Sequence, residues 1–89
     1  MKTIYIYIEG KVQEVGFRYF TLQKATVYNI KGTVKNNLTR RSVEIYCQGK
    51  GKDLEQFINK LRKGPALSVI LKFNLKIIEM GPYKDFKII

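Results

Sequence analysis

The sequence contains no histidine and only one cysteine, and these absences remove several classes of active site. Without histidine there is no serine–histidine or cysteine–histidine pair for nucleophilic catalysis. One cysteine and no histidine also leave no standard zinc site. Cys47 has no partner for an internal disulfide, which is typical of proteins in a reducing cytoplasm. The sequence therefore predicts chemistry that uses neither a metal nor a cofactor.

Long apolar segments and paired acids are missing as well. No apolar run approaches the roughly 20 residues that a membrane-spanning helix needs. The apolar stretch near the N-terminus alternates with tyrosines and leads into a glycine turn, so we expect a strand there and not a signal peptide. We therefore expect a cytoplasmic protein without a membrane partner. The 7 carboxylates show no spacing that suggests a paired-carboxylate mechanism.

Positive charge is abundant: 17 basic side chains against 7 acidic ones give a formal net charge of +10. Such a balance favours anionic partners, among them phosphorylated metabolites and nucleic acid. Because the lysines are scattered along the chain, an ordinary solvated basic surface explains most of them. A length of 89 residues predicts one domain, residues 1–89, and nothing in the sequence demands more than a monomer.

Apolar periodicity predicts the secondary structure. Alternating apolar residues predict strands at 2–8, 31–36, 42–48 and 69–77 and a short edge strand at 86–89. A helix is expected at 17–28, and an amphipathic helix from Asp53 or a neighbour up to Gly64. Leu71, Phe73, Leu75 and Ile77 are expected to share one apolar strand face. The β-α-β-β-α-β order predicts an α+β, ferredoxin-like two-layer sandwich, with an antiparallel sheet and two helices on one face.

The stretch from Gly10 to Arg18 carries the clearest functional signal and reads Gly-Lys-Val-Gln-Glu-Val-Gly-Phe-Arg. It connects a predicted strand to a predicted helix, and glycines bracket the turn. A tight loop with free backbone N–H groups at a helix N-terminus is suited to anions. Arg18 at its mouth supplies the bidentate donor that matches phosphate. Because the Gly-Lys-Ser/Thr ending of a nucleotide P-loop is absent, the loop predicts a site for a small phosphate-bearing group.

Cleavage of an acyl phosphate is a reaction that needs neither a strong general base nor a metal. Its leaving group is a carboxylate, which is stable without protonation, so no general acid is required. Phosphoryl transfer passes through a loose transition state that is stabilised mainly by positioning and by charge. A loop of backbone N–H groups, one arginine and one side chain that orients water would be sufficient.

Two motifs together resemble the acylphosphatase family: Gly-x-Val-Gln-x-Val-Gly-Phe-Arg and the asparagine of Gly32-Thr-Val-Lys-Asn36. The resemblance covers the whole chain, including the order of elements, the Gln48-Gly49 end of a strand and the Asp-Phe-x-Ile sequence at 85–88. It implies hydrolysis of the carboxyl-phosphate bond to a carboxylate and inorganic phosphate, with phosphate acting as product and inhibitor. It also implies that Arg18 binds the phosphate and that Asn36 orients the attacking water. The resemblance implies a phosphate-binding loop made of Gln13, Glu14, Val15, Gly16, Phe17 and Arg18.

The sequence departs from the family pattern in two places. The hairpin after Asn36 reads Asn-Leu-Thr-Arg-Arg where the family often has Asp-Gly, which we expect to alter the shape of the loop more than the chemistry. Glu14 stands where the family usually has glycine, between Gln13 and Val15, so a carboxylate lies within the expected phosphate loop. Charge repulsion there would weaken phosphate binding. If the family glycine has a positive φ, the glutamate also adds backbone strain. A catalytically weakened anion-binding domain of the same fold is therefore an alternative to the active enzyme.

An RNA-binding domain is a further alternative, because domains with the same topology stack bases on aromatic side chains of an open sheet face. Tyr5, Tyr7 and Tyr46 are expected on that face, on the two central strands. The third strand, however, is far from the basic-glycine-aromatic pattern of such domains and places Glu44 where a base would stack. Cross-strand pairing of tyrosines on an exposed sheet explains the same residues, so the sequence argues against nucleic acid as the partner.

Overall fold

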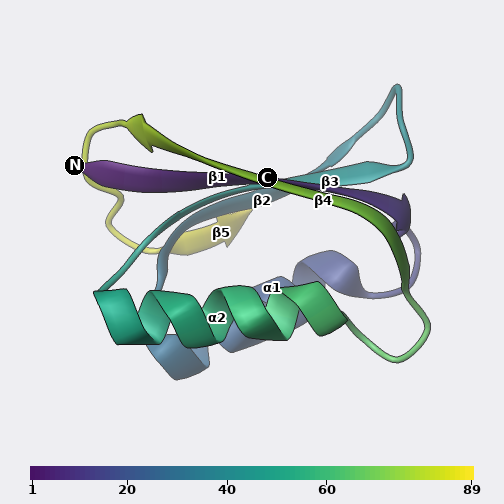
Figure 1. Ribbon diagram of the computed structural model, residues 1–89, viewed down its shortest axis with the longest axis horizontal. Coiled ribbons are helices and arrows are strands. Elements are labelled where there is room, and N and C mark those ends of the chain that lie inside the picture. Colours follow the sequence, from purple (N-terminus) through teal and green to yellow (C-terminus); the bar gives the residue numbers. More distant parts are fainter.

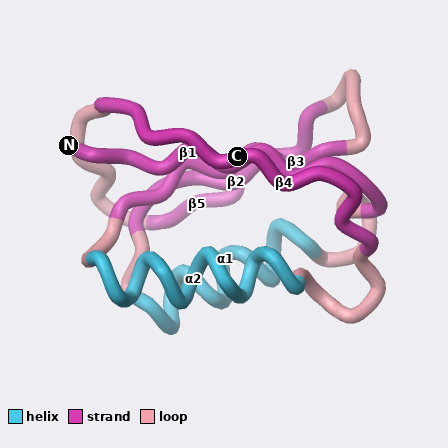
Figure 2. The backbone as a smooth tube through the Cα atoms, in the orientation of Figure 1, coloured by secondary structure: helices cyan, strands magenta, loops and turns pink.

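A computed structural model describes residues 1–89. Figure 1 and Figure 2 show two layers, with both helices packed against one face of a five-stranded sheet. The elements are β1 (Lys2–Lys11), α1 (Phe17–Tyr28), β2 (Lys31–Asn37), β3 (Ser42–Gln48), α2 (Gly51–Lys63), β4 (Val69–Glu79) and β5 (Phe86–Ile88). No helix is long and apolar enough to cross a membrane.

The sheet has the strand order β4-β1-β3-β2-β5. The four long strands pair antiparallel, which confirms the predicted ferredoxin-like arrangement. The short strand β5 differs, because it pairs parallel with β2 and makes the sheet mixed. The chain leaves β4, crosses one end of the sheet and enters β5 beside the start of β2, where the Gly32 N–H donates to the Asp85 carbonyl at 2.8 Å.

Several elements extend beyond the range that periodicity predicts. β1 continues past Ile8 to Lys11 because Gly10 and Lys11 pair with Ile70 and Val69 on β4. α2 begins at Gly51, before Asp53. By contrast, α1 has the predicted bounds and is followed by Asn29 in the left-handed conformation. At the end of β1 the backbone pairing with β4, and not the apolar pattern, sets the boundary.

A β-bulge between β1 and β4 changes which side chains of β4 face the helices. Phe73 is in register with Ile8, but the next inward pair is Gly10 with Ile70, so Leu71 has no partner residue. Leu71 is 78% exposed, whereas Ile70 packs against the core. The expectation that Leu71 shares the apolar face of Phe73 is therefore wrong, because the extra residue of a bulge reverses the alternation beyond it.

The core lies between the sheet and the helices, as the alternation of the strands predicts. Ile4, Ile6 and Ile8 of β1 point inward and are nearly or fully buried. Their neighbours across the sheet are Cys47, Ile45 and Val43 of β3. The helices contribute Phe17, Ala25, Phe57 and Leu61. This single core is the platform on which the loop between β1 and α1 rests.

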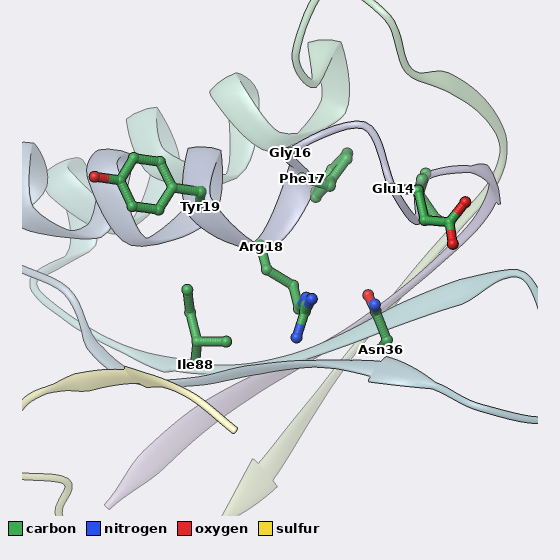
Figure 3. Close-up of a pocket in the computed structure, with 8 residues that line it drawn as sticks. Glu14, Gly16, Phe17, Arg18, Tyr19, Asn36 and Ile88 are labelled. Carbon is green, nitrogen blue, oxygen red and sulfur yellow. The ribbon is translucent and has the colours of Figure 1, made fainter.

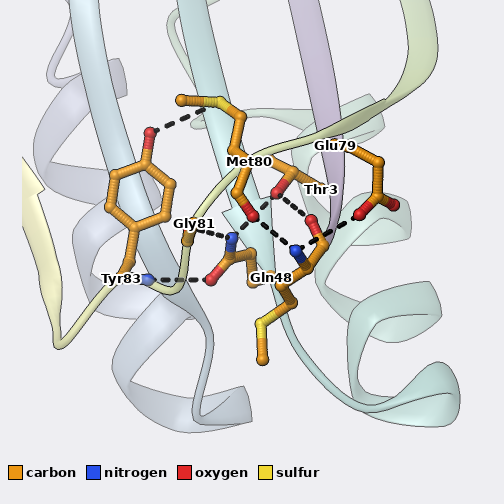
Figure 4. A network of polar contacts seen from close by, with 7 residues as sticks. Thr3, Gln48, Glu79, Met80, Gly81 and Tyr83 are labelled. Atoms are coloured by element: carbon orange, nitrogen blue, oxygen red, sulfur yellow. Dashed lines mark hydrogen bonds and ion pairs between the residues drawn. The ribbon is translucent and has the colours of Figure 1, made fainter.

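A polar network anchors the segment that leads to β5 (Figure 4). The buried amide of Gln48 donates to the Thr3 hydroxyl at 2.8 Å and to the Gly81 carbonyl at 3.0 Å, and its oxygen accepts the Tyr83 N–H at 3.0 Å. Because every polar atom of this amide is paired, the connection is fixed to the sheet. β5 is thereby held against β2.

The open sheet face carries the tyrosines as predicted. Tyr5 and Tyr46 pair across β1 and β3 with ring centroids 5.0 Å apart, and Lys76 lies over the Tyr5 ring. The Tyr5 hydroxyl donates to Glu44 at 2.8 Å, and burial together with this carboxylate raises the pKa of Tyr5. These rings contact one another and neighbouring side chains, which fits cross-strand pairing better than a platform for bases.

Candidate functional site

The loop from Val12 to Gly16 joins the end of β1 to the start of α1. Glu14 has φ 62° and Gly16 has φ 79°, so two residues of this short loop have left-handed backbone conformations. Gly16 is also the N-cap of α1, and no side chain caps this helix end. A left-handed residue beside helical ones turns successive N–H groups toward the same side, which forms a concave surface for an anion.

The backbone N–H groups of this loop lack acceptors within the protein. No N–H from Gln13 to Tyr19 donates to a backbone carbonyl, and the first such bond of α1 is donated by Phe20 to Gly16 at 2.9 Å. No acidic residue lies in the first turn of the helix either. A row of free amides at the positive end of a helix is a binding surface for a negatively charged group.

A cavity of about 260 Å³ lies beneath this loop (Figure 3). It is bounded by the loop, by the first turn of α1, by the far end of β2 and by the C-terminal strand β5. Its lining consists of Val12, Glu14, Gly16, Phe17, Arg18, Tyr19, Asn36 and Ile88.

Arg18 and Asn36 reach this cavity from different elements. Arg18 lies in the first turn of α1 and makes no ion pair with any carboxylate of the protein. Asn36 is in register with the buried Val43, so the alternation of β2 directs its side chain toward the helix layer. Its Oδ1 atom is buried without a hydrogen-bond donor. A buried amide oxygen of this kind calls for a donor, and a water or ligand in the cavity can supply one.

Glu14 lines the same cavity, but its side chain is exposed to solvent. Figure 3 shows its carboxylate pointing away from Arg18. The backbone of Glu14 is strained, because its φ of 62° is one that residues other than glycine rarely adopt. Because the carboxylate is exposed to a medium of high dielectric constant, we expect backbone strain to be the larger effect of this glutamate.

Gln13 and Val15 belong to the predicted loop, but their side chains do not line the cavity. The Gln13 amide donates to the carbonyls of Asn37, Arg40 and Ser42 at 2.8, 3.0 and 3.0 Å. It thereby ties the loop to the hairpin between β2 and β3. Val15 instead packs against the hydrophobic core. The side chains of both residues therefore shape the loop, and only their backbone could contact a ligand.

Three lining residues were not predicted from the sequence: Val12, Tyr19 and Ile88. Tyr19 adjoins Arg18 on the helix, and its 73% exposure is a signal that only the structure provides. Ile88 reaches the cavity because β5 pairs with β2, which sets it opposite Val34. The apolar pattern of a strand as short as β5 does not predict that it pairs parallel with β2. No group of three or more histidine, cysteine, aspartate or glutamate side chains is arranged to hold a metal ion.

Taken together, the fold and the cavity define a small ferredoxin-like domain with an anion-binding loop at one end of its sheet. The acylphosphatase family model matches residues 4–88. The chain is 39% identical over 88 residues to an acylphosphatase of Archaeoglobus fulgidus, covering 99% of this chain and 98% of that protein. It is 42% identical over 89 residues to an acylphosphatase of Staphylococcus haemolyticus, covering 98% of each.

A solved structure agrees with these relatives. The crystal structure of acylphosphatase from Bacillus subtilis superimposes with a TM-score of 0.93 at 29% identity, covering 100% of this chain and 99% of that one. The chain belongs to the acylphosphatase family, as its two motifs predict.

Proposed function

We propose that this protein hydrolyses the carboxyl-phosphate bond of acyl phosphates, releasing a carboxylate and inorganic phosphate. The observation that carries the proposal is that one cavity holds both the Arg18 guanidinium, which has no ion pair, and the buried Oδ1 atom of Asn36, which has no hydrogen-bond donor. The first suits a phosphate group and the second suits a water molecule. Membership of the acylphosphatase family supports the same activity.

Arg18 and the loop amides bind the phosphate in this proposal. The guanidinium offers a planar fork of donors that matches two phosphate oxygens. The free N–H groups between Gln13 and Arg18 surround the remaining oxygens. They lie at the N-terminus of α1, where the helix dipole favours negative charge. As the bond to the leaving group lengthens, these fixed donors stabilise the charge on the transferred group without reorganising.

Asn36 orients the attacking water. Its buried Oδ1 accepts a hydrogen bond from that water and directs a lone pair of the water oxygen at phosphorus. A new P–O bond forms to water, and the P–O bond to the acyl group breaks, with its electron pair remaining on the carboxylate. A dianionic acyl phosphate and water yield a carboxylate and H₂PO₄⁻, so both protons of the water end on the phosphate product.

This chemistry needs little from acid–base groups, because a carboxylate leaves without being protonated. It also explains how a protein without histidine can catalyse a hydrolysis. Phosphate monoesters are poor substrates on the same argument, since an alkoxide leaving group needs a general acid. Inorganic phosphate fits the same donors and acts as a competitive inhibitor.

The proposal extends to the domain organisation, the oligomeric state and the cellular location of the protein. Residues 1–89 act as one domain that contains every proposed catalytic group, and the domain works as a monomer. The reduced and buried Cys47 fits a cytoplasmic protein. The alternative of a weakened binding domain rests on Glu14 alone, whose exposed carboxylate gives it little support.

The test is a hydrolysis assay with benzoyl phosphate, with a phosphate monoester as the control substrate. We expect turnover of benzoyl phosphate that EDTA does not alter, and little turnover of the monoester. Arg18→Ala should lower kcat/KM by about 1,000-fold, which is typical for loss of a preorganised charge-stabilising donor. Arg62→Ala is the matched control, because it removes the same charge from a side chain that stacks on Phe73. Loss of activity in EDTA that a divalent metal restores, or equal effects of the two arginine variants, would contradict the proposal.

A further inference from the structure

The far side of the cavity from Asn36 is apolar. Figure 3 shows the Arg18 guanidinium between Asn36 on one side and Ile88 on the other, with Tyr19 above Ile88. Tyr19 comes from the first turn of α1 and is 73% exposed, while Ile88 comes from β5 and is 37% exposed. We call these two side chains the apolar lip.

In-line displacement relates this lip to the leaving group. In phosphoryl transfer the attacking and leaving oxygens lie on opposite sides of phosphorus. With the phosphate on Arg18 and the water on Asn36, the leaving carboxylate projects away from Asn36. This direction leads to Tyr19 and Ile88. We infer that the apolar lip binds the acyl group and makes the enzyme selective for acyl phosphates with neutral, apolar acyl chains.

The charges of the cavity support this substrate class over anionic acyl groups. Arg18 is the only cation that lines the cavity, and the phosphate occupies it. The other charged lining residue is Glu14, whose carboxylate is exposed and points away from Arg18 in Figure 3, so it offers no positive charge to a second carboxylate. An acyl group with a carboxylate of its own therefore meets no additional cation, whereas an apolar one covers the exposed faces of Tyr19 and Ile88. The inference rests on the function proposed above and specifies its substrate.

The backbone holds the lip in place. Ile88 is in register with Val34 on β2, and the next N–H, that of Ile89, donates to the Val34 carbonyl at 2.9 Å. Asn36 lies two residues further along the same strand. β2 thus sets the position of the group that orients water and, through β5, the position of a group that contacts the acyl chain. The distance between the two sides of the cavity is fixed by one sheet.

The test compares kcat/KM for acetyl, butyryl, benzoyl and succinyl phosphate. For the wild type we expect benzoyl to exceed acetyl by about tenfold or more, because burial of a few apolar groups in a pocket gives discrimination of this order. Butyryl should also exceed succinyl, which has the same number of carbons but ends in a carboxylate instead of a methyl group. Tyr19→Ala and Ile88→Ala should each reduce the ratio of benzoyl to acetyl by about three- to tenfold. Inhibition by inorganic phosphate should stay within about twofold of the wild type.

Matched controls are available on the same elements. Ile89→Ala changes the neighbouring residue, which is 62% exposed, and Val27→Ala changes a 65% exposed side chain near the other end of α1. Neither should alter the ratio. Acetyl phosphate turnover reports that each variant is folded. Equal losses on all substrates, or weakened phosphate inhibition, would show that the lip only supports the fold and would overturn the inference. A wild type that hydrolyses no acyl phosphate would instead overturn the proposed function itself.

Discussion

Arg18 and Asn36 line one cavity from opposite layers of the fold, the first from a helix and the second from the sheet. Arg18 has no carboxylate partner, and the Oδ1 atom of Asn36 is buried without a donor. A phosphate would supply a negative charge beside Arg18, and a water molecule would supply the hydrogen-bond donor that Asn36 Oδ1 lacks. Buried polar atoms are rarely left without a partner, so the unpaired Oδ1 atom of Asn36 marks this cavity as a candidate site for a water molecule or a ligand.

Asn36→Ala should lower kcat by about 100-fold and change KM for benzoyl phosphate little. The reason is that the side chain acts on the attacking water and not on the bound phosphate, and loss of alignment alone costs this much. Steady-state kinetics check the prediction. Asn37→Ala is the control, since this neighbour faces the other side of β2 and its side chain caps the hairpin through Thr39. A rise in KM with an unchanged kcat would mean that Asn36 binds the substrate instead.

Glu14→Gly should stabilise the protein by about 1 kcal/mol, because glycine adopts a φ of 62° without the steric cost that glutamate meets. Glu14→Gln keeps the side chain and removes the charge, so it separates strain from repulsion. With an exposed carboxylate that points away from Arg18, we expect Gln to resemble the wild type in stability and in phosphate inhibition. Urea unfolding and inhibition assays measure both. If Gln recovers the same gain as Gly, repulsion is the dominant effect.

Gln13→Ala should loosen the phosphate loop without touching the cavity. It leaves the carbonyls of Asn37, Arg40 and Ser42 without this donor, and we expect a loss of about 1–3 kcal/mol in the free energy of unfolding. We also expect kcat/KM to fall about tenfold, since a misplaced loop aligns the phosphate poorly. Denaturant titration and kinetics on the same samples check this. Gln23→Ala, on the α1 helix, provides the control, and a Gln13→Ala variant with wild-type stability and activity would contradict the anchoring role.

Stability should decline with pH above about 9 because of Cys47. Burial raises the pKa of its thiol from 9.0 to about 12, so between these values the folded state keeps a proton that the unfolded state has lost. The free energy of unfolding therefore falls as pH rises through this range, by about 1.4 kcal/mol per unit at most. Between pH 8 and pH 10 we expect the wild type to lose about 1.4 kcal/mol more than Cys47→Ala, whose own lower stability does not affect the slope. Parallel pH dependences of the two proteins would contradict the prediction.

The sequence by itself determined the fold class, and it singled out Arg18 and Asn36, which the structure places at one cavity. Alternation in β1, β2 and β3 assigns one apolar face to each strand, and this is sufficient to predict helices on one side of the sheet. The same alternation carries Asn36 to the helix side, because it shares parity with the buried Val34. The glycine-bracketed loop before Arg18 predicts an anion site, since backbone N–H groups at a helix start need an acceptor whatever packs around them.

Only the tertiary structure decided which face Leu71 occupies, how Ile88 reaches the cavity and where the Gln13 side chain points. The bulge opposite Gly10 excludes Leu71 from the apolar face, and nothing in the alternation of β4 signals it. Ile88 enters the cavity through a parallel pairing between strands far apart in the chain. The direction of the Gln13 side chain depends on three carbonyls of a distant hairpin. Local periodicity reports which side of its own element a residue occupies. Contacts between distant segments depend on the packing of the whole chain, and the approach of Ile88 to the cavity is such a contact.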